Sequence, residues 1–294
     1  MQIGVEIKKT FKNNQHSRLQ MDDKAINNYY GISGILNSIL NGLESLGKDT
    51  HSLKPEDLSP IDEFHTRGKE STIEIAQLAQ LSSHHKVLDV GCGLGGSARY
   101  IANEYGCSVV GIDLTDEYID VANKLTEFVK LTDKVSFKQG SAIELPFPSE
   151  NFDIVWTEHT QMNIPDKEKF YGEMSRVLKP KGRLVFHDVF FGDTNSPHYP
   201  TPWAEYDSLS SLCTQEEAKS AIQQSNFVIN EWNDKSEQSL EFFKEIIKKI
   251  EKSGAPPLGF HLLMGKTAKT KLLNISRNLE EHRTSVVMGT ATKN

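Results

Sequence analysis

The chain has 294 residues, of which 37% are hydrophobic and 25% charged, and its formal net charge is −7. This composition is typical of a globular protein with one large α/β domain or two domains, and its acidity argues against nucleic acid as a partner. Its three cysteines are too far apart for a disulfide framework or a metal-binding pair, so we expect no metal. No apolar run predicts a membrane span and no leader predicts export, so we expect a cytoplasmic protein.

The first 60 residues are expected to form an N-terminal helical cap segment. Residues 1 to about 24 are polar, and we expect them to be only partly ordered. Apolar residues recur at helical spacing over residues 25–46, which predicts one or two helices. The stretch around Pro55 and Pro60 is predicted to be a loop.

Residues 61–235 are expected to form the core, because predicted strands and helices alternate along them. Such alternation indicates a parallel sheet with helices on both faces. Strands are expected at 86–90, 109–113, 135–139, 152–157, 183–190 and 227–232, and helices at 72–81, 98–105, 118–131, 167–178 and, after a capping box at Thr214 and Glu217, at 215–224.

The C-terminal part is expected to complete the same sheet. Residues 284–292 are rich in β-branched and small side chains and predict a seventh strand, so we assign residues 283–294 to the core. Residues 236–282 are mostly helical in pattern and are interrupted by the run from Gly254 to Gly259. We interpret them as a helical cap insertion over the substrate site.

A glycine-rich turn follows the first predicted strand of the core. The run from Val87 to Gly96 reads VLDVGCGLGG and predicts a strand, a tight loop and the start of a helix. Asp113 ends the next strand about 20 residues after Gly91, where nucleoside-binding units place the acid that binds ribose. Asp89 would repel the pyrophosphate of a dinucleotide but suits an ammonium group, which favours S-adenosylmethionine over NAD(P).

These residues, together with the runs Gly140–Phe147 and Phe152–Trp156, resemble the class I S-adenosylmethionine-dependent methyltransferases over roughly residues 60 to 235. The likeness is to the small-molecule branch, which includes ubiquinone/menaquinone, tocopherol and sarcosine/dimethylglycine methyltransferases. It implies a Rossmann-like, seven-stranded, mostly parallel sheet with helices on both faces. It also implies S-adenosyl-L-methionine as cofactor and in-line transfer of its methyl group to O, N or C of a small-molecule acceptor.

The resemblance assigns the cofactor site residue by residue. Gly91 and Gly93 are expected to hold the methionine part, Asp113 to accept from both ribose hydroxyls, and Leu114 to pack on the adenine. Many relatives have Asp-Ala after the third strand, where this chain has Ser141-Ala142. The contact with the adenine is therefore expected from the Ser141 hydroxyl or the Ala142 N–H. The remaining residues that we assign to the cofactor are Ser141, Ala142, Tyr30, Thr66, Gly68, Asp89 and Glu158.

His159 and Asp188 are the candidate catalytic residues. They follow the fourth and fifth strands, and ligands of open α/β sheets bind beyond the carboxyl ends of the strands. His159 is either a general base or a positioning residue, and Asp188 is either an acid at the acceptor or a buried structural acid. Five aromatic residues are expected to wall the acceptor pocket: Trp156, Phe190, Phe191, Tyr199 and Trp203.

Three other functions remain open on the sequence alone: a non-catalytic S-adenosylmethionine-binding protein, an NAD(P)-dependent dehydrogenase, and a nucleic-acid base methyltransferase. The last would carry an Asp/Asn-Pro-Pro-Tyr/Phe loop, from which the run Asn163 to Asp166 departs at two places. The sequence decides neither the acceptor nor the oligomeric state, and a homodimer is left open.

Overall fold

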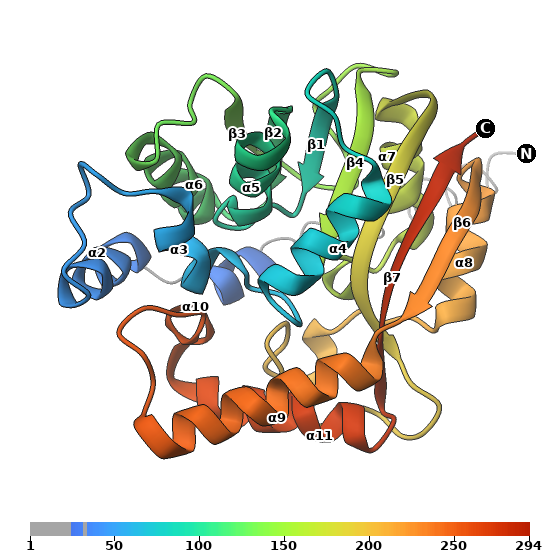
Figure 1. Cartoon of the computed structure of the whole chain (residues 1–294). Helices are drawn as coiled ribbons and strands as arrows, with labels where there is room; N and C mark the ends of the chain where they lie inside the picture. Colours follow the sequence, from blue (N-terminus) through green and yellow to red (C-terminus); the bar gives the residue numbers. More distant parts are fainter. Residues whose placement is uncertain (1–24, 32–33) are drawn as a thin grey trace, which may run out of the picture.

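The computed structural model describes residues 25–31 and 34–294, so the expectation for residues 1–24 lies outside the described residues. A seven-stranded sheet has the order β3-β2-β1-β4-β5-β7-β6, in which β1 to β5 are parallel and β7 runs antiparallel to both neighbours (Figure 1). The mostly parallel sheet is thereby confirmed. Its strands are β1 (Lys86–Val90), β2 (Ser108–Asp113), β3 (Val135–Gln139), β4 (Phe152–Glu158), β5 (Leu178–Phe191), β6 (Phe227–Asp234) and β7 (Thr284–Lys293).

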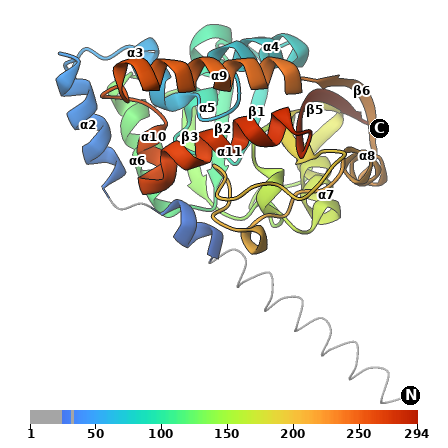
Figure 2. The ribbon, with the colours of Figure 1, turned by 90° about the horizontal axis from the view of Figure 1, so that it is seen from below.

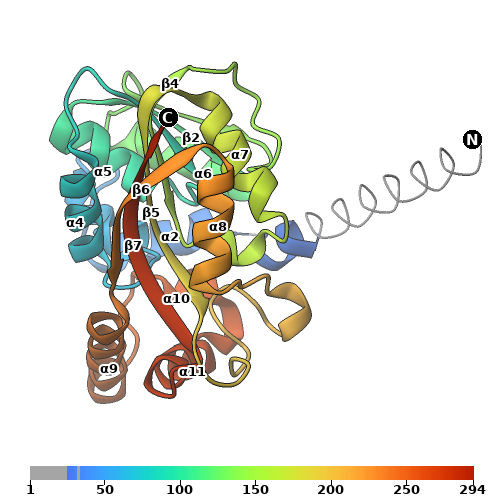
Figure 3. The ribbon, with the colours of Figure 1, turned by 90° about the vertical axis from the view of Figure 1, so that its right-hand side faces the viewer.

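Helices cover both faces of this sheet. The apolar sides of α4 and α5 pack on one face, and those of α7 and α8 pack on the other, as the edge-on view of Figure 3 shows. Helix α6 lies beside β2 and β3. The helices up to the sixth strand are α2 (Ile35–Ser45), α3 (Pro55–Asp62), α4 (Lys69–Ala79), α5 (Gly96–Tyr105), α6 (Asp116–Phe128), α7 (Lys167–Val177) and α8 (Gln215–Gln224), with 3-10 turns η1 (Gln161–Asn163) and η2 (Asp207–Leu209).

The local sequence explains these elements. Four of the five residues of β1 are buried, as expected of a parallel strand covered on both faces. Helix α5 lies between Gly95 and Gly106, which both have positive φ. The predicted capping box of α8 is present, because Thr214 Oγ1 accepts from Glu217 N and the Glu217 carboxylate accepts from Thr214 N.

The predicted loop around Pro55 and Pro60 is wrong, because these residues lie in helix α3. Pro55 is the first helical residue, where no N–H is needed, and Asp57 accepts a hydrogen bond from Lys54 N at 3.0 Å. Pro60 removes one helical hydrogen bond, but Leu58 and Ile61 of the same helix are buried. Burial of the apolar side of α3 therefore outweighs the local preference of proline for loops.

The elements between β6 and β7 form a layer across the carboxyl ends of the parallel strands (Figures 1 and 2). They are α9 (Ser236–Ser253), α10 (His261–Met264), η3 (Gly265–Thr267) and α11 (Ala268–Glu280), and α9 packs against α11. Residues 25–30 are helical, and Tyr29 Oη donates to Thr201 O at 3.0 Å. We call residues 25–31, 34–60 and 236–282 the cap; its separation from a core of 61–235 and 283–294 stays a prediction. No helix within the described ranges has the length and apolar character needed to cross a membrane.

Candidate active site

A cavity lies between the carboxyl ends of the strands and the cap. It is lined by the glycine loop, by the residues that follow β2, β3 and β4, and by side chains of α9, α10 and α11. Three of the predicted site residues, Gly68, Asp89 and Asp188, are not among those that line it. The predicted residues that do line it are Tyr30, Thr66, Gly91, Gly93, Asp113, Leu114, Ser141, Ala142, Glu158 and His159.

Asp113 is held at the edge of the cavity by main-chain donors. Gly93 N donates to its Oδ2 and Thr115 N donates to its Oδ1, both at 2.9 Å. Burial raises the pKa of Asp113, although these hydrogen bonds oppose the effect. Each carboxylate oxygen can accept more than one hydrogen bond, so the side chain is fixed in place and still able to accept from ligand hydroxyls.

Asp89 lies behind the glycine loop and is 3% exposed. Its Oδ2 atom has no hydrogen-bond partner among the described residues. Burial, together with the charges of Glu158 and Asp113, raises the pKa of Asp89 well above its ordinary value. Three carboxyl groups therefore surround the loop, an arrangement that suits an ammonium or sulfonium group and disfavours a phosphate.

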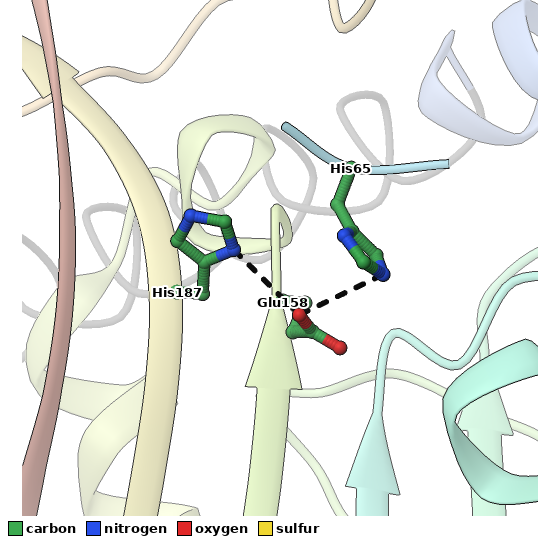
Figure 4. A group of neighbouring side chains, drawn as sticks. All are labelled: His65, Glu158 and His187. Carbon is green, nitrogen blue, oxygen red and sulfur yellow. Dashed lines mark ion pairs between the residues drawn. The ribbon is translucent and has the colours of Figure 1, made fainter. Parts of the chain in front are cut away.

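Glu158, at the end of β4, is the centre of a buried hydrogen-bonded cluster. Its Oε2 accepts from Ser97 Oγ at 2.7 Å and from Trp156 Nε1 at 2.8 Å. Its Oε1 lies 3.7 Å from His65 Nε2 and 3.6 Å from His187 Nδ1 (Figure 4). Burial favours the neutral acid, but the charge of His65 and the contact with His187 outweigh it and lower the pKa of Glu158 to about 2.

His65, Glu158 and His187 offer three ligand atoms within 4.8 Å of one another, a spacing that a metal site could use. His65 Nε2, however, also lies 3.2 Å from Glu63 Oε2. Burial opposes protonation, but Glu158 and Glu63 outweigh it and raise the pKa of His65 to about 9. His65 Nε2 thus lies close to two carboxylates, and we interpret the cluster as an ion-pair network.

His159 faces the cavity from the turn after β4. Its backbone is left-handed, with φ of 48°, and its N–H donates to His187 O at 2.8 Å. A non-glycine residue in this conformation is often held there for function. Burial, together with the neighbouring imidazoles of His187 and His65, lowers the pKa of His159 well below its ordinary value, so the imidazole is neutral at pH 7.

Asp188 does not meet His159 in the cavity. Successive side chains of a strand point to opposite faces, so His187 reaches Thr66 while Asp188 lies on the side of α7 and α8. Asp188 is 1% exposed and its Oδ2 accepts from Gln161 N at 3.4 Å. Burial raises the pKa of Asp188 to about 8, against the effect of that hydrogen bond and of Lys167.

The segment before α4, which contains Thr66 and Gly68, connects His159 with His187. Thr66 Oγ1 lies 3.2 Å from His159 Nε2 and 3.1 Å from His187 Nε2. Gly68 precedes α4 with φ of 50° and shapes the turn without reaching the cavity. Tyr30 Oη donates to Asn163 Oδ1 at 3.0 Å and thereby connects the N-terminal part of the cap to η1.

The aromatic walls of the cavity differ from those predicted. Of the five expected aromatic residues, only Trp203 lines it, while Trp156 and Phe190 lie in the two layers of sheet core. The prediction missed the apolar faces that the cap helices turn inward, although their helical spacing is visible in the sequence. The walls are formed instead by Phe64, Phe242, Phe243, Phe260, Leu263, Met264, Leu272 and Ile275.

Comparison with known proteins gives a family match for part of the core. Residues 88–186 match the family described as "Methyltransferase domain". The chain is 46% identical over 99 residues to a "Probable tocopherol O-methyltransferase, chloroplastic" of Oryza sativa subsp. japonica, covering 34% of the chain and 27% of that protein. It is 34% identical over 161 residues to a sterol 24-C-methyltransferase of Debaryomyces hansenii, covering 53% of the chain and 43% of that protein. The chain thus spans less than half the length of either relative.

Among solved structures, the crystal structure of the [4+2]-cyclase SpnF resembles this chain. It superposes with a TM-score of 0.65 at 20% identity and covers 88% of this chain and 92% of that one. At this level of identity the likeness concerns the fold alone.

Proposed function

We propose that this chain, which contains an S-adenosylmethionine-dependent methyltransferase domain, is an enzyme that transfers a methyl group to an apolar small molecule. The observation that carries the proposal is the continuous cavity described above. One end has the acidic glycine loop and Asp113, and the other has the aromatic and aliphatic walls of the cap.

The residues at the first end fit the cofactor. A Cβ at Gly93 would meet no atom within 4 Å, so the cavity is open directly over this backbone. The carboxylate of Glu158, which lines the cavity and has a lowered pKa, provides negative charge for the ammonium and sulfonium groups, and Asp89 Oδ2, behind the loop, has no hydrogen-bond partner among the described residues. S-adenosylmethionine, when bound, supplies an electrophilic methyl group on sulfur. Asp113 would bind the ribose hydroxyls, and Leu114 and Ala142 lie where they could contact the adenine.

The second end suits a lipophilic acceptor. Eight apolar side chains of the cap and of the segment before α4 wall it, and ligand pockets of this kind bind apolar molecules with few polar contacts. The names of the relatives, a tocopherol and a sterol methyltransferase, agree with this class.

His159 is the proposed general base. It lines the cavity and is neutral at pH 7, so it can take a proton from a hydroxyl or N–H acceptor as that atom attacks the methyl carbon. Because its pKa is low, it is a weak base and suits an acidic hydroxyl such as a phenol. Asp188 is proposed to hold the turn that carries His159, through its hydrogen bond with Gln161 N. Closure of the cap would align the acceptor and exclude water.

The cytoplasmic location, the absence of nucleic-acid partners and a homodimer remain proposals. The acidic composition and the scattered cysteines support the first two. The rice relative is named as chloroplastic, so localisation of a tagged full-length protein is the measurement that decides the compartment.

The test uses S-adenosylmethionine labelled with tritium on the methyl group. The full chain is incubated with phenols and with sterols, each class including polar and apolar compounds. The tritium label is then measured in the purified products. We expect label in one or more apolar acceptors, with one S-adenosylhomocysteine formed for each methyl group transferred. Binding of S-adenosylmethionine without transfer to any acceptor would favour the non-catalytic alternative.

A further inference from the structure

The tautomer of His159, and so the ring nitrogen that can act as a base, depends on its hydrogen bonds with Thr66 and, through Thr66, with His187. Its Nε2 and the Nε2 of His187 both lie within hydrogen-bond distance of the same oxygen, Thr66 Oγ1. A hydroxyl donates only one proton. If Thr66 donates to one imidazole, it must accept an N–H from the other, so the two tautomers are coupled.

Glu158 sets the direction of this chain of hydrogen bonds. Its Oε1 belongs to an ionised carboxylate and can only accept, and it faces His187 Nδ1 at 3.6 Å. The contact is attractive only when His187 carries its proton on Nδ1, so we infer this tautomer for His187. Its Nε2 then keeps a lone pair and accepts from the Thr66 hydroxyl, and Thr66 Oγ1 in turn accepts from an N–H at His159 Nε2.

The opposite direction has one contact in its favour and a larger cost. Thr66 N lies 3.4 Å from His159 Nε2 and favours a lone pair on that nitrogen. The proton of His187 would then be on Nε2, and His187 Nδ1 and Glu158 Oε1 would face each other as two acceptors. Both atoms are buried and neither has a partner within hydrogen-bond distance in the described part of the chain, so their contact at 3.6 Å would be one between two lone pairs. Two opposed buried acceptors without a proton are more costly than one long hydrogen bond.

We propose that Thr66, His187 and Glu158 are positioning residues that hold His159 as the Nε2–H tautomer and direct its Nδ1 lone pair to the acceptor. Within the described residues His159 Nδ1 has no hydrogen-bond partner, and the side chain lines the cavity. In the reaction the acceptor's proton moves to Nδ1 and forms an imidazolium. The electron pair that it leaves forms the bond to the methyl carbon, and the carbon–sulfur pair returns to sulfur. This catalytic part rests on the proposed function, but the tautomer does not.

The direct test is nitrogen-15 NMR of the full chain labelled at histidine, at pH 8, with the signals of His159 assigned from a His159→Asn variant. We expect a protonated Nε2 and an unprotonated Nδ1. A proton on Nδ1, or on both nitrogens, would overturn the proposal whatever the activity of the protein.

Two variants break the chain at different points. Thr66→Val removes the hydroxyl at nearly constant volume and should abolish the single tautomer of His159. Glu158→Gln should invert it: Ser97 and Trp156 are donors and hold the amide oxygen at the Oε2 position, so the NH2 group must point at His187 Nδ1. An unchanged tautomer in both variants contradicts the proposal.

Thr157→Val is the matched control. Thr157 is also fully buried on β4, and its hydroxyl has no hydrogen-bond partner among the described residues. The tautomer of His159 should not change in this variant. Circular dichroism checks the fold of each protein, and Glu158→Gln keeps the test available if Thr66→Val does not fold.

Once an acceptor is known, kinetics test the catalytic part. Loss of an oriented base should lower kcat by about 10²-fold in Thr66→Val. Thr66→Ser restores the hydroxyl and should recover the rate. Failure of Thr66→Ser to recover kcat would show that Thr66 acts through packing. The expected tautomer in a protein without any transferase activity would refute the proposed function and leave the network standing.

Discussion

Alanine at Gly91 should mainly lower stability, whereas alanine at Gly93 should mainly weaken cofactor binding. The two glycines are two residues apart in the same loop and both have left-handed backbones, with φ of 76° and 51°. A Cβ at Gly91 would collide with Thr160 Oγ1, whereas a Cβ at Gly93 would meet no atom within 4 Å and would project into the cavity. Comparing the two variants therefore distinguishes the contribution of the loop to folding from its contribution to cofactor binding.

The expected magnitudes follow from these surroundings. A left-handed alanine costs about 1–2 kcal/mol at either position. Gly91→Ala must also displace Thr160, whose hydroxyl is held by Val90 O at 3.2 Å and by Glu158 O at 3.1 Å. Overpacking of this kind costs about 1–3 kcal/mol more, so Gly91→Ala should lower the free energy of unfolding by about 2–5 kcal/mol and Gly93→Ala by about 1–2 kcal/mol.

Urea unfolding measures the first effect, and calorimetric titration with S-adenosylhomocysteine measures the second. Gly93→Ala should lose at least about tenfold in affinity, which corresponds to about 1.4 kcal/mol, because its methyl group occupies the space over the backbone. Equal destabilisation of the two variants would refute the packing argument. Normal affinity in Gly93→Ala would refute the placement of the ligand.

Four further outcomes are expected. Asp113→Ala should weaken cofactor binding by about 1.5–3 kcal/mol in calorimetry, whereas Asp116→Ala, which removes an exposed carboxylate from the same turn, should not. Hydrogen exchange of the cap should slow when S-adenosylhomocysteine binds, and unchanged exchange would count against a lid. The low pKa of His159 keeps it neutral as pH rises, so kcat should be level above pH 7 and fall only below 6.5; an inflection above pH 7 would point to another base. Burial raises the pKa of Asp188 to about 8, so the protonated side chain contributes its full stability below pH 3.8, the ordinary pKa, and this stability is lost as pH rises through 8. The free energy of unfolding in urea should therefore be lower at pH 9 than at pH 6, and Asp188→Asn should remove this difference.

The core of the fold follows closely from local sequence signals. The buried run of β1 and the glycines around α5 are short-range features, and each predicted strand of the sheet is present. The sequence does not predict helix α3, because Pro60 is unfavourable inside a helix, and only the burial of Leu58 and Ile61 in tertiary contacts shows why the helix forms.

The site was only partly predictable. Main-chain and strand-end residues such as Gly93 and Asp113 lie where the sheet topology places them, so spacing along the chain was sufficient to find them. The position of Asp188 required knowledge of which face of β5 meets the cavity, and alternation alone does not give it. The pairing of His65 with Glu158 joins residues from distant segments, and no periodic signal in the sequence connects them.

Everything proposed for the cavity depends on S-adenosylmethionine binding at the carboxyl edge of the sheet, which calorimetric titration of the unmodified full chain measures directly. We expect saturable binding of one molecule per chain, abolished by excess S-adenosylhomocysteine and unaffected by NADH. No detectable binding, or displacement of S-adenosylmethionine by NADH, would contradict the assignment of this site.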